Sequence, residues 1–453
     1  MDQPRKPPTD GRPPDAGRRR FLTGGLAAGL WPLVPTGVAA AAGEGAPAAA
    51  AAARPALHLV PGYVHESARF RGRPLTEQAR FTKAVPKGYG GYLTMVTRLD
   101  EADGSVVRAL FPLSGHEITV HPDGTAAFFN AMDDVVMASF DPRTLEPGVL
   151  AAPFHDNYTG GGHALTAPDG LHLVETERRT YLPYSGRPED HFGRVVIRDW
   201  KTLKVVEVYE SGGMAPHQIR LLDGGRLLAI AHYGSAEWPD GDDRQGLPYI
   251  VQPCLTIVEL AGGKVVHKVL SPDKRFDLRH LAVRGLDGIF AIQGRLARFA
   301  EAEAAMAGWG DVYEPDIWSG GEQIAYLPAP LLRFDATRDP VAVTAQRTAD
   351  PLLMRYGQTI VYDPVHDEAI ATYPSNNCVI VFAGADGAVK RVIRTDRLGL
   401  QQPRGISLHP DGLHYVVSGY WRHIFQFRRG SHELARDRCR YLTLFGHSHS
   451  TVI

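Results

Sequence analysis

The sequence predicts an all-β fold, a β-propeller of seven blades. Short apolar runs of β type recur throughout the chain, Asp-Gly and Gly-Gly turns separate them, and one kind of segment repeats at blade-like intervals. A long apolar pattern with a helical period occurs at one place, residues 295–308, where an Ala- and Glu-rich helix is expected as an insertion.

The N-terminal segment predicts export. A polar, basic stretch leads to an Arg-Arg-x-Phe-Leu motif beginning at Arg18, then to a short apolar run and a stretch of small residues that ends near Ala42. This order is typical of a secretory signal peptide, and the paired arginines are typical of the twin-arginine type. We expect residues 1–42 to be removed on export to the periplasm. The alternative is a cytoplasmic protein with a disordered basic tail.

The remaining composition is that of a globular protein. Without residues 1–40, which hold six Lys and Arg and three Asp and Glu, the formal net charge moves from −1 to −4. No basic tract follows, so nucleic acid is excluded as an expected partner. The apolar run of the leader is too short to span a bilayer, so no membrane insertion is expected after cleavage. We expect a flexible extension over residues 43–89 and one propeller domain over residues 90–453.

The three cysteines contain no C-x-x-C pair. They allow one disulfide at most, and buried free thiols are the alternative.

The repeated segment begins with a polar residue, continues as an apolar strand and reaches a turn five or six residues later. The intervals from one start to the next are 47, 54, 63, 78, 46 and 45 residues. Propeller blades have about 40–50 residues, so the longer intervals indicate insertions, near residues 236–250 and 295–325. The starts are His116, His163, His217, His280, Gln358, Arg404 and, at the end of the chain, His447 or His449.

The last residues, 445–453, repeat the opening of this strand and then stop. Residues 90–113 supply strands without such an opening. We therefore expect the C-terminal strand to complete the first blade, which removes an open sheet edge and brings the count to seven. Six or eight blades stay open as alternatives, because residues 54–89 are ambiguous.

The repeat predicts a ring of histidines. The innermost strands of a propeller surround its axis, so equivalent residues at their starts face one mouth of the central channel. Imidazole is a ligand of Zn, Cu, Fe and Ni. We expect a transition-metal ion (Cu, Fe or Zn) bound by His116, His163, His217, His280, His447 and His449. A pocket for an anion or small molecule and a purely structural ring are the alternatives.

Gln358 and Arg404 occupy the same repeat position in the two remaining blades. We expect both at the same mouth as cofactor-binding residues, where an amide and a guanidinium would hold an anionic small molecule or a substrate carboxylate. No H-E-x-x-H, C-x-x-C-H, G-x-S-x-G or P-loop pattern competes with the ring.

Three function classes follow. The first is a periplasmic metal-binding protein in metal acquisition or redox chemistry. The second is a propeller hydrolase, similar to lactonases, in which a metal activates water. The third is a binding scaffold for a small molecule or protein, without metal. The sequence leaves open whether there is catalysis.

The leader, the segments SGHEITVHPDG, GGHALTAPDG, APHQIRLLDGGRLLAIAHYG and DLRHLAV, and a His close to the C-terminus together resemble the domain of unknown function 1513 family. The resemblance covers roughly residues 90–453. It implies a twin-arginine-exported periplasmic propeller in a context of iron or metal uptake, with periplasmic metal-uptake proteins as partners.

Overall fold

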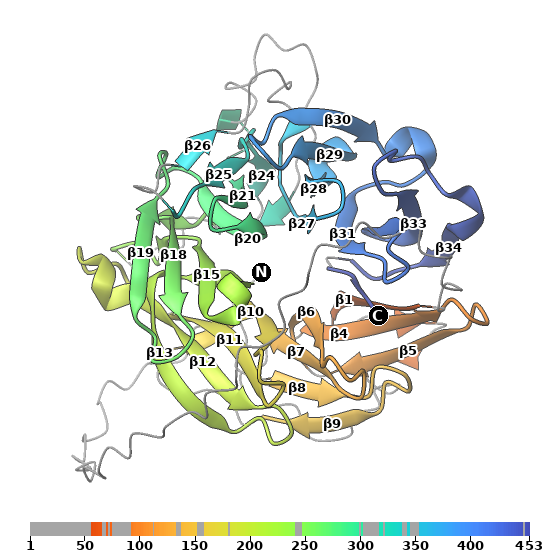
Figure 1. The fold of residues 1–453 in the computed structure, drawn as a ribbon, viewed down its shortest axis with the longest axis horizontal. Helices are drawn as coiled ribbons and strands as arrows, with labels where there is room; N and C mark the ends of the chain where they lie inside the picture. Colours follow the sequence, from red (N-terminus) through yellow and green to blue (C-terminus); the bar gives the residue numbers. More distant parts are fainter. Residues whose placement is uncertain are drawn as a thin grey trace, which may run out of the picture. The chain divides into compact units, whose positions relative to one another are not determined.

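The computed structural model describes residues 56–65, 69–70, 73–74, 92–111, 113–132, 137–151, 158–179, 182–240, 247–298, 300–301, 317–319, 322–337, 342–344, 353–446 and 449–453. These residues form mainly strands, turns and short 3-10 helices (Figure 1). The expected signal peptide at 1–42 lies outside them.

Seven sheets of four antiparallel strands surround a central axis in the part of the chain that the structure describes (Figure 1). From the innermost strand outward, the first blade is β35 (Thr451–Val452), β1 (Leu57–His65), β4 (Tyr92–Asp100) and β5 (Val106–Phe111). Blades two to four are β6 (Gly115–Val120), β7 (Ala127–Ala131), β8 (Met137–Phe140), β9 (Pro147–Leu150); β10 (Tyr158–Thr166), β11 (His172–Arg179), β12 (Phe192–Asp199), β13 (Val205–Met214); and β14 (Pro216–Leu222), β15 (Leu227–His232), β18 (Cys254–Glu259), β19 (Val265–Leu270). Blades five to seven are β20 (Asp277–Gly285), β21 (Gly288–Gly294), β25 (Leu332–Phe334), β26 (Ala342–Thr344); β27 (Thr359–Asp363), β28 (Glu368–Tyr373), β29 (Cys378–Ala383), β30 (Val389–Arg394); and β31 (Pro403–Leu408), β32 (His414–Gly419), β33 (Arg422–Arg428), β34 (Arg440–Thr443). The predicted seven-bladed propeller is confirmed.

The apolar core is divided among the blade interfaces. A buried apolar cluster lies between each pair of neighbouring blades, for example around Phe129 between blades one and two and around Ile380 between blades five and six. Another, with Val60 and Val416, joins blades one and seven. Because every sheet buries both faces against its neighbours, the hydrophobic effect closes the ring as well as holding each blade.

The two chain ends meet in the first blade, as the sequence predicts. His58 pairs with Val452 and Leu59 with Thr451, and the backbone of Leu57 exchanges two hydrogen bonds with Ile453, at 2.8 and 3.0 Å. The C-terminal strand is therefore the innermost strand of a blade whose other strands come from the start of the propeller.

The propeller begins earlier in the chain than we expected. Strand β1 lies inside the 43–89 segment that was expected to be a flexible extension, and it pairs with β4 along its whole length. Pro61 and Gly62 interrupt its β pattern and weaken the sequence signal. Gly62 is required because the carbonyl oxygen of Phe445 lies 1.4 Å from where a Cβ would stand, so the C-terminal segment crosses there.

Small additional sheets fill the long intervals. They are β2 (Arg69–Phe70) with β3 (Arg73–Pro74), β16 (Ser235–Ala236) with β17 (Tyr249–Ile250), and β22 (Leu296–Arg298) with β24 (Glu322–Tyr326) and β23 (Ile317–Ser319). The helix expected at 295–308 is wrong at its start, because Leu296–Arg298 pairs across the insertion with Ile324–Tyr326. Residues 302–308 lie outside the described part of the chain.

Each additional sheet connects the second and third strands of a blade. Strands alternate in direction within a blade, so this connection returns to the face where the innermost strands begin. We call the face where the innermost strands begin the entry face. The Asp-Gly hairpins of blades two to five and seven lie at the opposite face.

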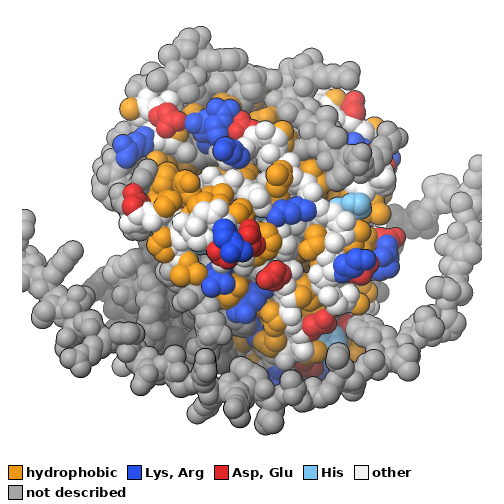
Figure 2. Space-filling model, turned by 90° about the vertical axis from the view of Figure 1, so that its left-hand side faces the viewer, with side chains coloured by type: hydrophobic (Ala, Val, Ile, Leu, Met, Phe, Trp, Pro, Cys, Tyr) orange, Lys and Arg blue, Asp and Glu red, His pale blue; other side chains and the backbone are white. Residues whose placement is uncertain are grey.

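The cysteines Cys254, Cys378 and Cys439 are free and buried. This agrees with the alternative of buried thiols, and burial raises the pKa of Cys254 and of Cys378 to about 12. No helix in the described ranges is long and apolar enough to cross a membrane. On the side of the molecule that Figure 2 shows, hydrophobic side chains are interspersed with Lys, Arg, Asp and Glu side chains.

Candidate metal centre

The repeated histidines lie at irregularities of the innermost strands. The pairing register shifts between Gly115 and Glu117 in β6, and equivalent shifts occur in β10, β14 and β20 at or next to His163, His217 and His280. A β-bulge breaks strict alternation and re-aims a side chain. Here the imidazoles face one another near the axis rather than the neighbouring blades.

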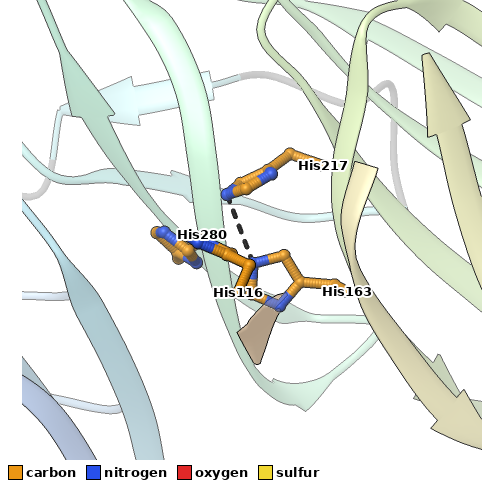
Figure 3. Close-up of side chains that lie close together, drawn as sticks. All are labelled: His116, His163, His217 and His280. Carbon is orange, nitrogen blue, oxygen red and sulfur yellow. Dashed lines mark hydrogen bonds between the residues drawn. The ribbon is translucent and has the colours of Figure 1, made fainter. Parts of the chain in front are cut away.

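Four imidazoles from four consecutive blades converge on one small volume (Figure 3). His116, His163, His217 and His280 are at most 2% exposed, and one ring nitrogen of each lies within 4.8 Å of all the others. The Nε2 atoms of His163 and His217 are 3.2 Å apart.

His449, from the C-terminal segment, adjoins the same cluster. It is 1% exposed, and its Nε2 lies 3.0 Å from Nε2 of His116. Its ring centroid is 4.8 Å from that of His280 and 5.0 Å from that of His163. We call these five residues the histidine ring. His447, the other candidate near the C-terminus, lies outside the described residues.

The outer nitrogens of three rings are held by hydrogen bonds. Nδ1 of His163 is 2.6 Å from Oε2 of Glu117, Nδ1 of His217 is 2.5 Å from the carbonyl oxygen of Gly161, and Nδ1 of His449 is 3.1 Å from Oγ1 of Thr359. Such partners fix the tautomer and the orientation of a metal-binding imidazole. They leave Nε2 facing inward, where its lone pair can bind a metal ion. Nδ1 of His280, by contrast, is buried without a hydrogen-bond partner.

Electrostatics keep part of the ring neutral. Burial, with smaller contributions from neighbouring imidazoles and arginines, lowers the pKa of His217 and of His280 well below its usual value. Burial alone would raise the pKa of Glu117, but His163 and Arg220 lower it to about 2. His217 and His280 therefore present neutral lone pairs, and the carboxylate of Glu117 beside the ring is ionised.

These distances suit a metal ion. A tetrahedral zinc site with bonds of about 2.0–2.1 Å places its nitrogens about 3.3 Å apart. The separations of 3.0 and 3.2 Å are close to this value. Nitrogen-only donor sets suit Zn and Cu(II), and imidazole also binds Fe and Ni. The cluster could therefore hold a transition-metal ion.

Gln358 and Arg404 start blades six and seven as predicted, and they bind each other. Nη1 of Arg404 donates to Oε1 of Gln358 at 2.9 Å and to the hydroxyl of Tyr356. The guanidinium lies over the rings of Tyr356 and Tyr420, 4.7 and 4.3 Å from their centroids. Both residues are more than nine-tenths buried.

Sequence reasoning missed the partners that surround the ring. Glu117, Gly161 and Thr359 orient imidazoles, and Tyr233 stacks on His217 with centroids 4.6 Å apart. A weak signal exists in the sequence, because Glu117 and Thr359 each directly follow a start of the repeat. Their role depends on contacts with the next blade, which the repeat alone does not give.

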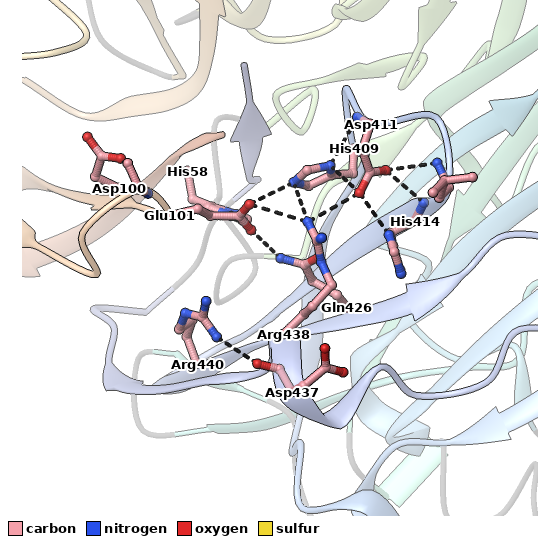
Figure 4. A network of polar contacts seen from close by, with 12 residues as sticks. His58, Asp100, Glu101, His409, Asp411, His414, Gln426, Asp437, Arg438 and Arg440 are labelled. Atoms are coloured by element: carbon pink, nitrogen blue, oxygen red, sulfur yellow. Dashed lines mark hydrogen bonds and ion pairs between the residues drawn. The ribbon is translucent and has the colours of Figure 1, made fainter. Parts of the chain in front are cut away.

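A second cluster of potential ligands lies at the opposite face (Figure 4). Glu101 accepts hydrogen bonds from His58, His409, Gln426 and Arg438, and so joins the first and seventh blades. His58, Glu101 and His409 also have the spacing of metal ligands. Because the guanidinium of Arg438 already binds this carboxylate, we interpret the group as a structural latch and call it the closure latch.

One solved structure supports the fold, and a second aligns less well. A chain of hydrazine synthase from Kuenenia stuttgartiensis aligns with 75% of this chain and 92% of its own length, at 11% identity and a TM-score of 0.51. A functionally unknown protein from Desulfotomaculum acetoxidans aligns with 73% of this chain and 81% of its own, at 12% identity and a TM-score of 0.43. No curated protein sequence matches the chain.

The sequence also matches a family model. The model, described as "Protein of unknown function (DUF1513)", covers residues 110–437, which include the starts of blades two to seven from His116 to Arg404. His449, supplied by the closing strand, lies beyond the match. Since the match spans well over half of the sequence, this chain belongs to the DUF1513 family.

Proposed function

We propose that this protein binds a transition-metal ion, Cu, Zn or Fe, through the histidine ring at one end of its central channel. Three or four of His116, His163, His217, His280 and His449 would be ligands, and the others would support them. The protein would then serve in metal acquisition or redox chemistry. The observation that carries the proposal is the convergence of five buried imidazoles from five blades.

Two features support a metal rather than a structural ring. Without an ion, five imidazoles packed together contribute little to the stability of the fold. They repel one another when protonated, and when neutral each has a buried lone pair that needs a hydrogen-bond partner. The outer nitrogens of His163, His217 and His449 are held by other groups, so a common ligand would take the inner nitrogens, which contact one another in this structure.

The hydrolase alternative has weaker support. Hydrolytic propellers with a hard cation need carboxylate or amide oxygens as ligands. The carboxylate of Glu117 is engaged by the outer nitrogen of His163, and the amide oxygen of Gln358 accepts from Arg404. A scaffold without metal would leave the arrangement of the ring unexplained.

Metal analysis of protein purified from its own compartment tests the proposal. We expect close to one ion per chain, and single His→Ala changes at the true ligands should lower the metal content steeply. His172→Ala is the matched control, because this histidine pairs with Asp169 at a hairpin of the opposite face. Equal metal content in the wild-type protein and in a variant lacking all five imidazoles would refute the proposal.

We further propose that the protein works in the periplasm after twin-arginine export. This pathway carries folded proteins, which suits a site assembled from five blades, with one imidazole from the C-terminal segment. Replacing Arg18 and Arg19 by Lys should leave the precursor in the cytoplasm, as fractionation and immunoblotting would show. Normal export of that variant would contradict the proposal.

A further inference from the structure

Arg404 is a buried cation without an acidic partner among the residues that the structure describes. It is 8% exposed, and within the described residues its contacts are the hydroxyl of Tyr356, the amide oxygen of Gln358 and the faces of two tyrosine rings. Nε of Arg404 is buried and makes no hydrogen bond. Its hydrogen bonds to described residues all use Nη1, so the edge formed by Nε and Nη2 has no described hydrogen-bond partner.

Two other buried arginines of this propeller have acidic partners. Arg279, 9% exposed, makes a two-pronged ion pair with Asp277 at 2.7 and 2.9 Å, and Arg198 pairs with Glu175 and Glu177. A guanidinium stays charged at every physiological pH, so burying one without an anion is costly. Stacking on Tyr356 and Tyr420 offsets only part of this cost.

The backbone at Arg404 lies beside the segment that supplies His449 to the histidine ring. Gln358, which accepts from Arg404, directly precedes Thr359, whose hydroxyl contacts Nδ1 of His449. A Cβ added at Gly405, the residue after Arg404, would lie 2.7 Å from the carbonyl carbon of His449. Arg404 therefore starts its strand directly beside the segment that supplies the fifth imidazole.

A shelf of aromatic side chains connects the same guanidinium to the other side of the ring. Tyr356 stacks on Tyr326 with centroids 3.9 Å apart, and the hydroxyl of Tyr326 accepts from Arg279 at 3.4 Å. Arg279 directly precedes His280. The shelf thus runs from blade five to blade seven along the entry face of the ring.

We propose that the ring metal and Arg404 together bind the carboxylate of a small organic acid. This inference rests on the proposed metal function. A divalent ion held by three or four neutral imidazoles keeps its positive charge and an open coordination position. One carboxylate oxygen would take that position, while the other would accept from the free edge of Arg404, the fork geometry that guanidinium and carboxylate share. The anion would neutralise both the metal ion and the guanidinium of Arg404, which has no anionic partner in the described residues.

Oxalate binding to the copper-loaded protein tests the proposal. Titration followed by electron paramagnetic resonance should show a saturable change in the copper signal, with chloride at equal ionic strength as the reference. Arg404→Gln should weaken oxalate binding at least tenfold at unchanged copper content, and Arg404→Lys, which keeps the charge but not the fork, should fall between. Arg422→Gln, at an exposed arginine of the same blade, is the matched control. Circular dichroism and melting curves would show whether each variant is folded.

The outcomes separate this inference from the proposed function. If copper binds and oxalate affinity is the same in wild type and in folded Arg404→Gln or Arg404→Lys, the carboxylate site is refuted while the metal function stands. If the wild-type protein binds no metal, the metal function fails. The joint carboxylate site then fails with it, and nuclear magnetic resonance of ¹³C-labelled oxalate with metal-free protein shows whether Arg404 binds the anion without a metal.

Discussion

At the scale of single residues, the ring depends on a position that carries no side chain. Gly162 precedes His163 with φ +94°, and a Cβ there would stand 2.8 Å from Cδ2 of His116 and 3.3 Å from Cε1 of His217. A methyl group would therefore press on two rings at once. The Gly-rich sequence before His163 is explained by this close approach and not by phosphate binding.

Gly162→Ala should lower metal affinity although every histidine is retained. Left-handed backbone costs a non-glycine residue about 1–2 kcal/mol, and displacement of His116 adds to this. Gly170→Ala is the matched control, because Gly170 also has positive φ, +66°, but has no atom within 4 Å of an added Cβ. Metal titration and thermal melting of both variants separate the two effects. If both lose stability equally and both bind metal normally, the contact with the ring is irrelevant.

Glu117 supports the ring from outside. Its carboxylate lies 2.6 Å from Nδ1 of His163, and such partners raise the basicity of the inward nitrogen. Glu117→Gln should weaken metal binding about 10–100-fold, the usual effect of losing an outer-shell carboxylate. Competition with a chromophoric chelator measures this, with the exposed Glu433→Gln as the control. Unchanged affinity would mean that the contact only positions the strand.

The histidines could be predicted from the sequence because they recur at one position of a repeat. Their orientation could not. Ala215, Tyr356 and Gln402, each two residues before a start of the repeat, have positive φ between 46° and 55°. None of them is glycine, so no residue type announces the turn that directs the following side chain to the axis. The partners Thr359 and Gly161 depend in the same way on packing between blades.

At the scale of elements, the closing strand has two roles. β35 supplies the innermost strand of the first blade, and His449, two residues before it, supplies an imidazole. Sequence analysis found this strand because it repeats the opening of the others. It missed β1, the partner of β35, because Pro61 and Gly62 hide the β pattern.

Deletion of residues 449–453 should destabilise the whole propeller. The truncation exposes the inner edge of β1 and removes the hydrogen bonds between Leu57 and Ile453. We expect a lower melting temperature and aggregation, measured by calorimetry and light scattering. His449→Ala in the full chain is the control, because it removes the imidazole but keeps the strand. If the truncated protein melts like the parent, the strand does not close the ring.

At the scale of the whole molecule, the ring of blades is fastened at one joint. Six interfaces join blades that follow one another along the chain, whereas blades one and seven bring together its first and last propeller strands. In the described residues these two blades meet through the closing segment, the cluster of Val60 and Val416, the closure latch and the hydrogen bond from Arg108 to the carbonyl oxygen of Thr443. Repeat spacing predicted the number of blades. Repeat spacing could not predict the latch, because Glu101 and His409 are 308 residues apart. Glu101 lies in the turn after β4 of blade one, and His409 lies in the turn after β31 of blade seven.

The latch makes stability depend on pH. Burial alone would raise the pKa of Glu101, but hydrogen bonds from His409, His58 and Gln426, together with the charge of His58, lower it well below its usual value. A carboxyl group with a lower pKa in the folded state contributes stability above the unfolded pKa, about 4.3, and loses it progressively as the pH falls below that value. The joint between blades one and seven should therefore weaken in acid.

Glu101→Gln should be less stable than wild type at pH 7, and the difference should shrink as the pH falls from 5 towards 3. At pH 7 the variant lacks the charge that Arg438 binds. As the pH falls below about 4.3, the carboxyl of Glu101 takes up a proton in the unfolded wild-type chain, which favours unfolding of the wild type and reduces its advantage. Urea unfolding at several pH values measures both free energies, and Glu433→Gln, at an exposed position of blade seven, corrects for a change in net charge. A difference that stays constant over this range would mean that Glu101 acts through its shape and not through its charge. A difference that grows in acid would mean that the carboxyl of Glu101 is already protonated in the folded protein, and the latch would then be held by neutral hydrogen bonds.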